Sequence, residues 1–264
     1  MHTLRVSLVQ GATRWHDPAG NRDYYGSLIA PLAGQTDLVV LPETFTSGFS
    51  NEAIHNAESM DGPTVAWLRE QAQSLDAAIT GSVQLRVGEG VYNRLLFVTP
   101  DGDVRHYDKR HLFRYADEHK RYAAGRDKLI VEWKGWKICP LVCYDLRFPV
   151  FVRNRHDAGR GFDYDLVLFV ANWPAARAHA WRTLLRARAI ENLSYCIGVN
   201  RVGVDGNQLP YAGDSAVLDF LGQAMVDLGA QEQVVTVSLD ADALRAFREK
   251  FPAWMDADAF ELNA

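Results

Sequence analysis

Cys143 stands where an apolar, β-prone run gives way to a polar turn, in the stretch WKICPLVCYDLRFP (136–149). Such a run is typical of a strand that is buried on both faces. A thiol at the end of that strand can face a cleft while the strand holds its backbone rigid, which suits a nucleophile. The alternative is a buried cysteine that only packs as a small hydrophobic side chain.

Two further strand ends carry the groups that a nucleophilic thiol needs. Glu43 follows the apolar run of DLVVLPETFTSGF (37–49), and Lys109 follows the second strand of a predicted hairpin at 91–113. The pKa of a thiol is ordinarily about 8.5, so the thiol needs a base or a nearby cation to react at neutral pH. A carboxylate can accept its proton, and a lysine can stabilise the oxyanion of a tetrahedral intermediate.

Each of these charged residues, taken alone, is also compatible with a solvated surface side chain. Three strand ends that carry a carboxylate, an ammonium and a thiol are better explained by shared chemistry than by chance. The combination requires no histidine as the base. None of the eight histidines follows a strong strand in the way that a cysteine–histidine pair would require, although His111 and His119 remain alternatives.

The strands that would position these residues alternate with helices. Predicted helices run from about Asn21, as the N-cap, to Leu32, from Pro63 onward, over 178–192 and over 240–251. Predicted strands cover 4–10, 37–42, 77–83, 91–113 as a hairpin, 165–174, 195–203, and 214–229 with 233–240 as an antiparallel meander. The segment 116–125 is too polar for the core. This order predicts one α/β domain over 1–264, two-layered or sandwiched, with mixed sheets.

Three stretches, PETFTSGF (42–49), YDKRHLF (107–113) and LVCYDLRFP (141–149), resemble the catalytic signatures of the nitrilase superfamily, the carbon–nitrogen hydrolases. They stand in the family's order, and the resemblance covers nearly the whole chain. It implies a four-layer α-β-β-α sandwich that dimerises. CYDLRFP and ANWP are most similar to the omega-amidase branch, whose members hydrolyse the terminal amide of α-ketoglutaramate or α-ketosuccinamate.

The resemblance implies a role for each matching residue. Glu43 is the expected general base for Cys143 and later for water, and Cys143 is the expected nucleophile that forms a thioester and releases ammonia. Lys109 and the backbone N–H of Tyr144 are expected to hold the oxyanion. Glu118 matches a second glutamate that orients Lys109 or the substrate amide. The implied reaction uses water, a small amide, and neither cofactor nor metal.

Substrate-binding residues are less clearly marked. An omega-amidase needs a cation for the carboxylate of the 2-oxo acid, and Arg147 is the candidate because guanidinium binds carboxylate with two parallel hydrogen bonds. A structural salt bridge beneath the turn is its alternative role. Trp173 and Phe45 either wall the pocket or belong to the core. Asn172 either binds substrate or caps its loop.

Composition sets the broad class. The 264 residues are 48% hydrophobic and 23% charged, as in ordinary globular chains, and the net charge of −5 gives no basic footprint for nucleic acid or an anionic membrane. No apolar run approaches the ~18 residues needed to span a bilayer. Cys139 and Cys196, the other two cysteines, are expected in the core. An odd, small number of cysteines favours a reducing compartment, so we expect a cytoplasmic protein.

Other functions remain open at this stage. An N-carbamoyl-amino-acid hydrolase or another short-chain amidase would use the same three residues. A true nitrilase fits less well, because CYDLRFP does not resemble the CWE motif of those enzymes. A non-catalytic binding member of the fold would not need all three groups. A redox role for Cys143 would require Cys139 to turn toward the same cleft as a resolving thiol.

Overall fold

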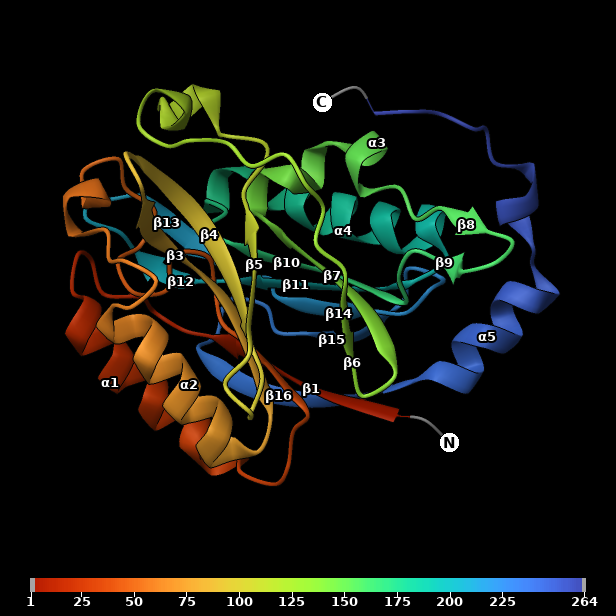
Figure 1. Ribbon diagram of the computed structural model, residues 1–264, viewed down its shortest axis with the longest axis horizontal. Helices are drawn as coiled ribbons and strands as arrows, with labels where there is room; N and C mark the ends of the chain where they lie inside the picture. The colour runs from red at the N-terminus through yellow and green to blue at the C-terminus, as the bar shows by residue number, and fades with distance from the viewer. Residues whose placement is uncertain (1–2, 263–264) are drawn as a thin grey trace.

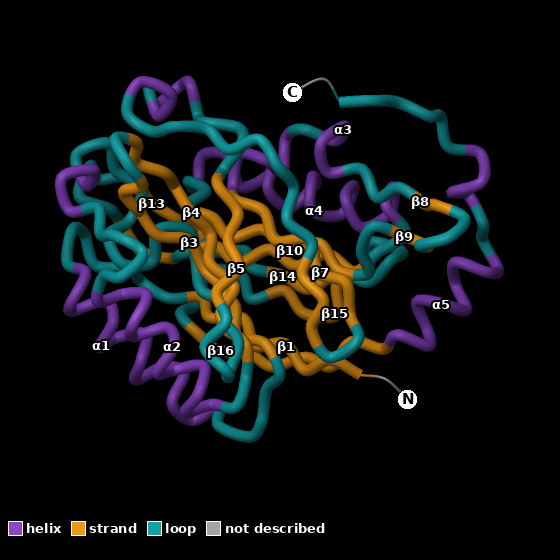
Figure 2. Tube along the Cα trace, viewed as in Figure 1, coloured by secondary structure: helices purple, strands orange, loops and turns teal. Residues whose placement is uncertain are grey.

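The computed structural model describes residues 3–262; residues 1–2 and 263–264, the ends of the predicted domain, lie outside the described part. Two six-stranded sheets pack face to face, with helices on their outer faces (Figures 1 and 2). The expected four-layer α-β-β-α sandwich with mixed sheets is confirmed.

The first sheet has the strand order β16 (Gln233–Asp240), β1 (Thr3–Gln10), β2 (Leu38–Val40), β3 (Ala78–Val87), β4 (Gly90–Val98) and β5 (Val104–Asp108). The second has the order β15 (Ala224–Asp227), β14 (Ala216–Leu218), β11 (Tyr195–Asn200), β10 (Leu166–Ala171), β7 (Trp136–Val142) and β6 (Val131–Trp133). Two small hairpins pair β8 (His156–Asp157) with β9 (Gly161–Phe162) and β12 (Val202–Val204) with β13 (Pro210–Ala212). Both large sheets contain parallel and antiparallel pairs.

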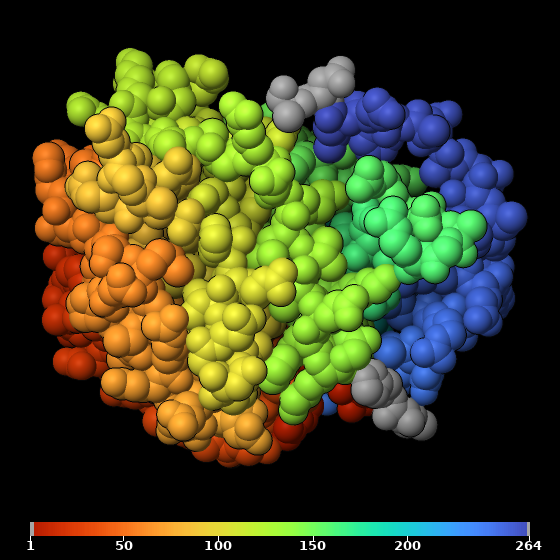
Figure 3. Space-filling view, viewed as in Figure 1, coloured from red at the N-terminus to blue at the C-terminus, as the bar shows by residue number. Residues whose placement is uncertain are grey.

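Helices α1 (Pro18–Ile29) and α2 (Pro63–Leu75) cover the first sheet, and α3 (Pro149–Val152) and α4 (Ala178–Asn192) cover the second (Figure 1). Helix α5 (Ala241–Lys250) follows β16 at one end of the molecule (Figure 1). In the space-filling view, the N-terminal third of the chain forms one side of the visible face and the C-terminal third the other (Figure 3). The middle of the chain, which carries Lys109 and Cys143, lies between them.

Alternation along β4 explains why the first sheet is buried on both faces. Leu95 and Phe97 point into the core between the sheets, whereas Leu96 and Val98 pack against the helix layer that includes Leu68 of α2. Successive side chains of a strand point to opposite faces, so an unbroken apolar run is what a strand between two layers requires. No helix within residues 3–262 has the length and apolarity that a membrane crossing needs.

Parallel pairing brings the predicted reactive residues to one edge of the sandwich. β7 pairs with β10 in parallel, with Val142 opposite Val170, so Cys143 and Asn172 both follow at the carboxyl ends of adjacent strands. Glu43 similarly follows β2, which runs parallel to β1 and β3. The carboxyl ends of parallel strands are where open α/β sheets bind ligands.

Two local predictions are wrong. The N-cap of α1 is Asp17, whose side chain accepts from the Gly20 N–H, whereas the Asn21 amide bonds to Arg14 and to the Thr46 carbonyl. The predicted meander stops at the β14–β15 hairpin, because β16 crosses to the other sheet and pairs antiparallel with β1 along all eight of its residues.

Candidate active site

Cys143 begins a short 3₁₀ turn, η5 (Cys143–Arg147), directly after β7, and its φ is +44°. A left-handed backbone costs an L-residue about 1–2 kcal/mol, so the surrounding structure must hold it there. The buried Asp145 carboxylate does so, because its Oδ2 accepts the Val142 N–H at 3.0 Å and the Tyr107 hydroxyl at 2.8 Å. The thiol is therefore presented from a rigid turn.

Lys109 joins two buried carboxylates beside this turn. Its Nζ lies 3.0 Å from Glu43 Oε1 and 3.0 Å from each carboxylate oxygen of Glu118. All three side chains are at most 1% exposed. Asn93 Nδ2 donates to Glu43 Oε1 at 2.8 Å, and the Asn172 backbone N–H donates to Glu43 Oε2 at 2.7 Å. Pairing of this kind is what allows charges to remain buried.

Burial and neighbouring charges set the protonation states. Burial favours neutral Lys109, but Glu118 and Glu43 outweigh it and raise the pKa of Lys109 well above its ordinary value, so this residue stays an ammonium. Burial raises the pKa of Glu118, with Lys109 opposing. Burial and then the Glu43 carboxylate raise the pKa of the Cys143 thiol well above its ordinary value, against the opposing effect of Lys109.

The resting nucleophile is therefore a thiol, and its proton must leave as attack occurs. Glu43 is placed to accept that proton, since it lines the same cavity as Cys143 and its carboxylate is close enough to raise the pKa of the thiol. The ammonium of Lys109 is available for a developing oxyanion. This arrangement can perform nucleophilic acyl transfer without a histidine.

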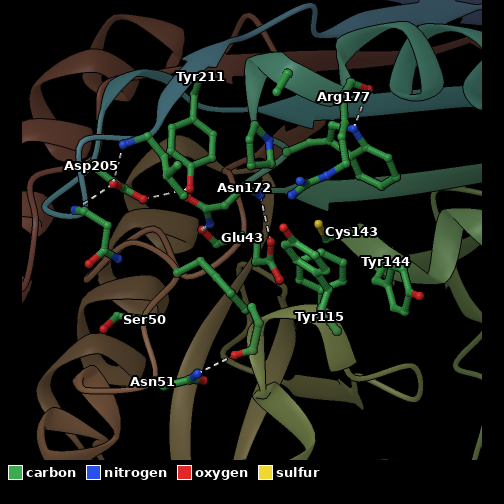
Figure 4. A pocket seen from close by; sticks show the side chains of 18 of the residues that line it. Glu43, Ser50, Asn51, Tyr115, Cys143, Tyr144, Asn172, Arg177, Asp205 and Tyr211 are labelled. Carbon is green, nitrogen blue, oxygen red and sulfur yellow. Dashed lines mark hydrogen bonds between the residues drawn. The ribbon is translucent and has the colours of Figure 1, made fainter.

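The three groups open into a cavity of about 400 Å³, within the size range of small-molecule sites. Figure 4 shows Glu43 and Cys143 at its centre, with Tyr115 and Arg177 beside them. Its other lining residues come from several loops: Phe49, Ser50, Asn51, Lys109, Phe113, Ala116, Tyr144, Arg147, Asn172, Trp173, Pro174, Ala176, Asp205, Asn207, Leu209, Pro210 and Tyr211.

Five of the predicted oxyanion and substrate residues line this cavity: Lys109, Tyr144, Arg147, Asn172 and Trp173. The Arg147 guanidinium lies 5.0 Å from the Trp173 ring and forms no ion pair within residues 3–262, so the alternative structural salt bridge is absent there. Asn172 Nδ2 donates to the Glu43 carbonyl and the Thr44 hydroxyl, and Asn172 Oδ1 has no partner in the described chain.

Phe45 does not line the cavity. It is fully buried in the core of the first sheet, with its ring centroid 5.8 Å from both Tyr25 and Trp67. The prediction of a pocket wall is wrong because the chain turns after Glu43, which sends Phe45 back under the helix layer while Glu43 faces the site.

The prediction that segment 116–125 is too polar to contribute to the core is wrong at Glu118. Glu118, in the 3₁₀ turn η4 (Glu118–Lys120), is fully buried, because Lys109 and the Phe113 N–H satisfy its carboxylate. The sequence does not distinguish a buried glutamate whose charge is compensated by such partners from a glutamate on the surface.

The remaining titratable candidates lie elsewhere. His111 hydrogen-bonds Asp145 through Nδ1 at 2.7 Å and stacks on Phe148, whereas His119 is absent from the cavity wall. Cys139 is fully buried on β7, and four residues of extended strand span about 13 Å, too far for a disulfide with Cys143 without rearrangement. Cys196 is likewise fully buried.

Sequence reasoning missed Asn93, Asp145, Tyr107 and Arg177. Asn93 carried a detectable signal, because it is a polar residue within the apolar run of β4. Asp145 lies inside the quoted CYDLRFP motif. Arg177 carried no signal, since a surface arginine before a helix is common. Within residues 3–262 no group of three or more His, Cys, Asp or Glu side chains is placed to hold a metal ion.

Comparisons with known proteins agree with this geometry. The profile of the family described as carbon-nitrogen hydrolase matches residues 5–249. The chain is 48% identical over 263 residues to "Omega-amidase YafV" of Escherichia coli K12, covering 99% of this chain and 100% of that protein. It is 31% identical to "2-oxoglutaramate amidase" of Bacillus subtilis, covering 95% and 96% of the two chains.

Solved structures extend the likeness to three dimensions. A CN-hydrolase superfamily protein from Xanthomonas campestris, with an arsenic adduct in its active site, is 70% identical over 100% of both chains, with a TM-score of 0.98. Nit3 of Saccharomyces cerevisiae, at 22% identity over 95% of each chain and a TM-score of 0.84, shares the fold. The chain belongs to the carbon–nitrogen hydrolase family of the nitrilase superfamily, whose members are enzymes that act on carbon–nitrogen bonds.

Proposed function

We propose that this enzyme is an omega-amidase that hydrolyses 2-oxoglutaramate or a similar 2-oxo dicarboxylic acid monoamide to the acid and ammonia. The observation that carries the proposal is the buried Glu43–Lys109–Glu118 cluster beside Cys143, in a small cavity whose lining includes Arg147. Two relatives with omega-amidase and 2-oxoglutaramate amidase names, matched over nearly their full lengths, support this substrate class.

In the first half-reaction, Glu43 accepts the proton of Cys143 as Sγ attacks the amide carbon and the C–S bond forms. Lys109 and the Tyr144 N–H, near the start of η5, stabilise the oxyanion. Glu43 then returns the proton to the amide nitrogen, the C–N bond breaks, and ammonia leaves a thioester on Cys143.

In the second half-reaction, Glu43 accepts a proton from water as the water oxygen attacks the thioester carbon. The tetrahedral intermediate collapses, the C–S bond breaks, and the proton returns from Glu43 to the Cys143 sulfur. Glu118 acts through Lys109, which it holds with two 3.0 Å contacts. Asn172 lines the cavity and holds Glu43 with its side-chain amide, and Trp173 supports Arg147 at the cavity wall.

Ammonia release from 2-oxoglutaramate, glutamine, an N-carbamoyl amino acid and a simple nitrile tests the substrate. A strong preference for 2-oxoglutaramate is the expected result. Preference for the carbamoyl compound would leave Cys143 as the nucleophile but would make the enzyme an N-carbamoyl-amino-acid hydrolase. Equal turnover of all four would overturn the omega-amidase proposal.

We also propose a single-domain enzyme that acts in the cytoplasm as a homodimer. The core between the sheets draws strands from both halves of the chain, which supports one domain. The three free cysteines suit a reducing compartment. Exposed Ile190, Leu221 and Met225 offer apolar surface for a second copy. Sedimentation of the purified enzyme tests the dimer, and a monomer at all concentrations would refute it.

A further inference from the structure

Two arginines of the catalytic cavity have guanidinium groups without an acceptor in the described part of the chain. Arg147 and Arg177 both line the cavity that contains Cys143, and within residues 3–262 neither guanidinium makes a hydrogen bond or an ion pair. Other arginines of this chain do so: Arg94 lies 2.7 Å from Asp108, and Arg248 lies 2.7 Å from Asp165. Two guanidiniums that line one cavity and have no acceptors can bind an anion there.

Trp173 holds both arginines in place. The Arg147 guanidinium carbon lies 5.0 Å from the centroid of the Trp173 ring, and the indole N–H of Trp173 donates to the Arg177 carbonyl at 2.8 Å. The Arg177 guanidinium carbon lies 5.2 Å from the Phe113 ring and 6.0 Å from the Tyr115 ring. Aromatic faces support a guanidinium without occupying the N–H donors at its edge, so those donors stay available.

The acidic residues of the cavity do not neutralise these cations. Glu43 is engaged by Lys109 and Asn93. Asp205 directs Oδ1 to the backbone N–H groups of Asn207 and Leu209 and Oδ2 to a tyrosine hydroxyl. Figure 4 shows Asp205 on one side of the pocket view and Cys143 and Arg177 on the other. The anion site therefore lies on the nucleophile's side of the cavity.

We propose that Arg177, together with Arg147, binds the substrate carboxylate remote from the scissile amide and is a specificity-determining residue for acid amides. This inference rests on the proposed function, and it adds Arg177 to Arg147 as a residue that binds the substrate carboxylate. One guanidinium can bind a carboxylate with two parallel hydrogen bonds, and two guanidiniums can satisfy its remaining acceptor positions. Because these arginines and Cys143 line one cavity of about 400 Å³, a short dicarboxylic monoamide is the substrate class that fits.

Three substrates of equal chain length separate the contribution of the carboxylate to binding from that of the oxo group. 2-Oxoglutaramate carries the carboxylate and the oxo group, glutaramate carries the carboxylate alone, and pentanamide carries neither. Arg177→Gln should raise KM for both acids about tenfold or more, because the variant loses charge-assisted hydrogen bonds to the substrate carboxylate. Its kcat/KM for pentanamide should stay within about twofold of wild type, because pentanamide has no carboxylate for the Arg177 guanidinium to bind.

Arg69→Gln is the matched control, because Arg69 lies exposed on α2 away from the cavity. It should leave all three substrates unchanged. Arg177→Lys keeps the charge without the planar fork, so it should restore only part of the affinity for the acids. The thermal unfolding midpoint of Arg177→Gln should match that of wild type, which separates loss of anchoring from loss of folding.

Equal losses on pentanamide and the acids would overturn the anchor role of Arg177, as would an unchanged KM for glutaramate. Suppose that the wild-type enzyme does not hydrolyse 2-oxoglutaramate but does hydrolyse glutaramate, and that Arg177→Gln raises KM for glutaramate. That result would overturn the proposed substrate and still support Arg177 as a carboxylate-binding residue. The double variant Arg147→Gln, Arg177→Gln tests the shared carboxylate. Effects on KM that simply add would contradict sharing, because residues that bind one group couple energetically.

Discussion

The hydroxyl of Tyr107 donates to Asp145 Oδ2 at 2.8 Å and links the strand that leads to Lys109 with the turn that begins at Cys143. Both side chains are buried, and the pKa of the Tyr107 hydroxyl is raised well above its ordinary value by burial and by the Asp145 charge. The hydroxyl therefore remains a donor at all working pH values. This contact sets the position of the nucleophile relative to the ammonium.

Tyr107→Phe should lower kcat about tenfold and the free energy of unfolding by about 1–3 kcal/mol. The change removes one donor from a buried carboxylate and an acceptor from the Arg110 N–H, and it lets the turn shift relative to Lys109. Urea unfolding and steady-state kinetics measure both quantities. Tyr92→Phe is the control, because the Tyr92 hydroxyl has no hydrogen bond in the described part of the chain. Unchanged kcat in Tyr107→Phe would exclude the positioning role.

Cys143→Ala should abolish ammonia release and leave the thermal unfolding midpoint close to that of wild type. The thiol is half-buried at a cavity edge, so its removal opens little new space. Cys139 is the control, because it is fully buried in the core. Cys139→Ala should leave kcat unchanged and lower the free energy of unfolding by about 1 kcal/mol, because the substitution leaves a small cavity. Wild-type turnover by Cys143→Ala would refute the mechanism.

Glu43→Gln should lower the pKa of the Cys143 thiol and still lose at least about a hundredfold in kcat. Burial and the Glu43 charge raise that pKa and Lys109 lowers it, so neutralising Glu43 removes one raising influence and leaves the lowering effect of Lys109 in place. The variant should then hold more thiolate at a given alkaline pH, but no carboxylate remains to protonate the departing amide nitrogen or to activate water. Thiolate absorbance against pH measures the first effect.

The control for this titration is Lys109→Met, which should move the thiol pKa upward because it removes the lowering charge. In wild type, the thiol remains protonated below its raised pKa, so activity near neutral pH depends on transfer to Glu43. A thiol pKa that rises in Glu43→Gln would contradict the assigned electrostatics.

Phe45→Leu should lower stability by about 1–2 kcal/mol and leave KM for the amide substrate within about twofold of wild type. Phe45 packs against Tyr25 and Trp67 in the core, outside the cavity. Phe113→Leu, at the cavity wall beside Arg177, should instead change KM. A large change in KM with unchanged stability in Phe45→Leu would instead indicate that Phe45 is part of the pocket wall.

Incubation with EDTA should leave kcat unchanged. Cys143 supplies the nucleophile, Glu43 the base and Lys109 the cation for the oxyanion, so the reaction has no step that calls for a metal ion. The measurement is ammonia release before and after dialysis against the chelator. Loss of activity that a divalent ion restores would show that the mechanism is incomplete.

The sequence by itself determined the family, the alternation of strands and helices, and the three strand ends at Glu43, Lys109 and Cys143. These depend on local patterns, because an apolar run that stops at a polar residue defines both a buried strand and its edge. Parallel pairing then places such ends together. Motifs that occupy consecutive residues, such as CYDLRFP, are likewise complete within the sequence.

Only the tertiary structure decided which neighbouring residues serve the site. Asn93 meets Glu43 across 50 residues, and Tyr107 meets Asp145 across 38, so both contacts depend on sheet register and on the packing of one sheet against the other. Glu118 is buried because Lys109 compensates its charge, and Phe45 leaves the cavity because the chain turns after Glu43. Composition and periodicity describe each segment alone, whereas a side chain's burial and orientation depend on what the rest of the chain brings against it.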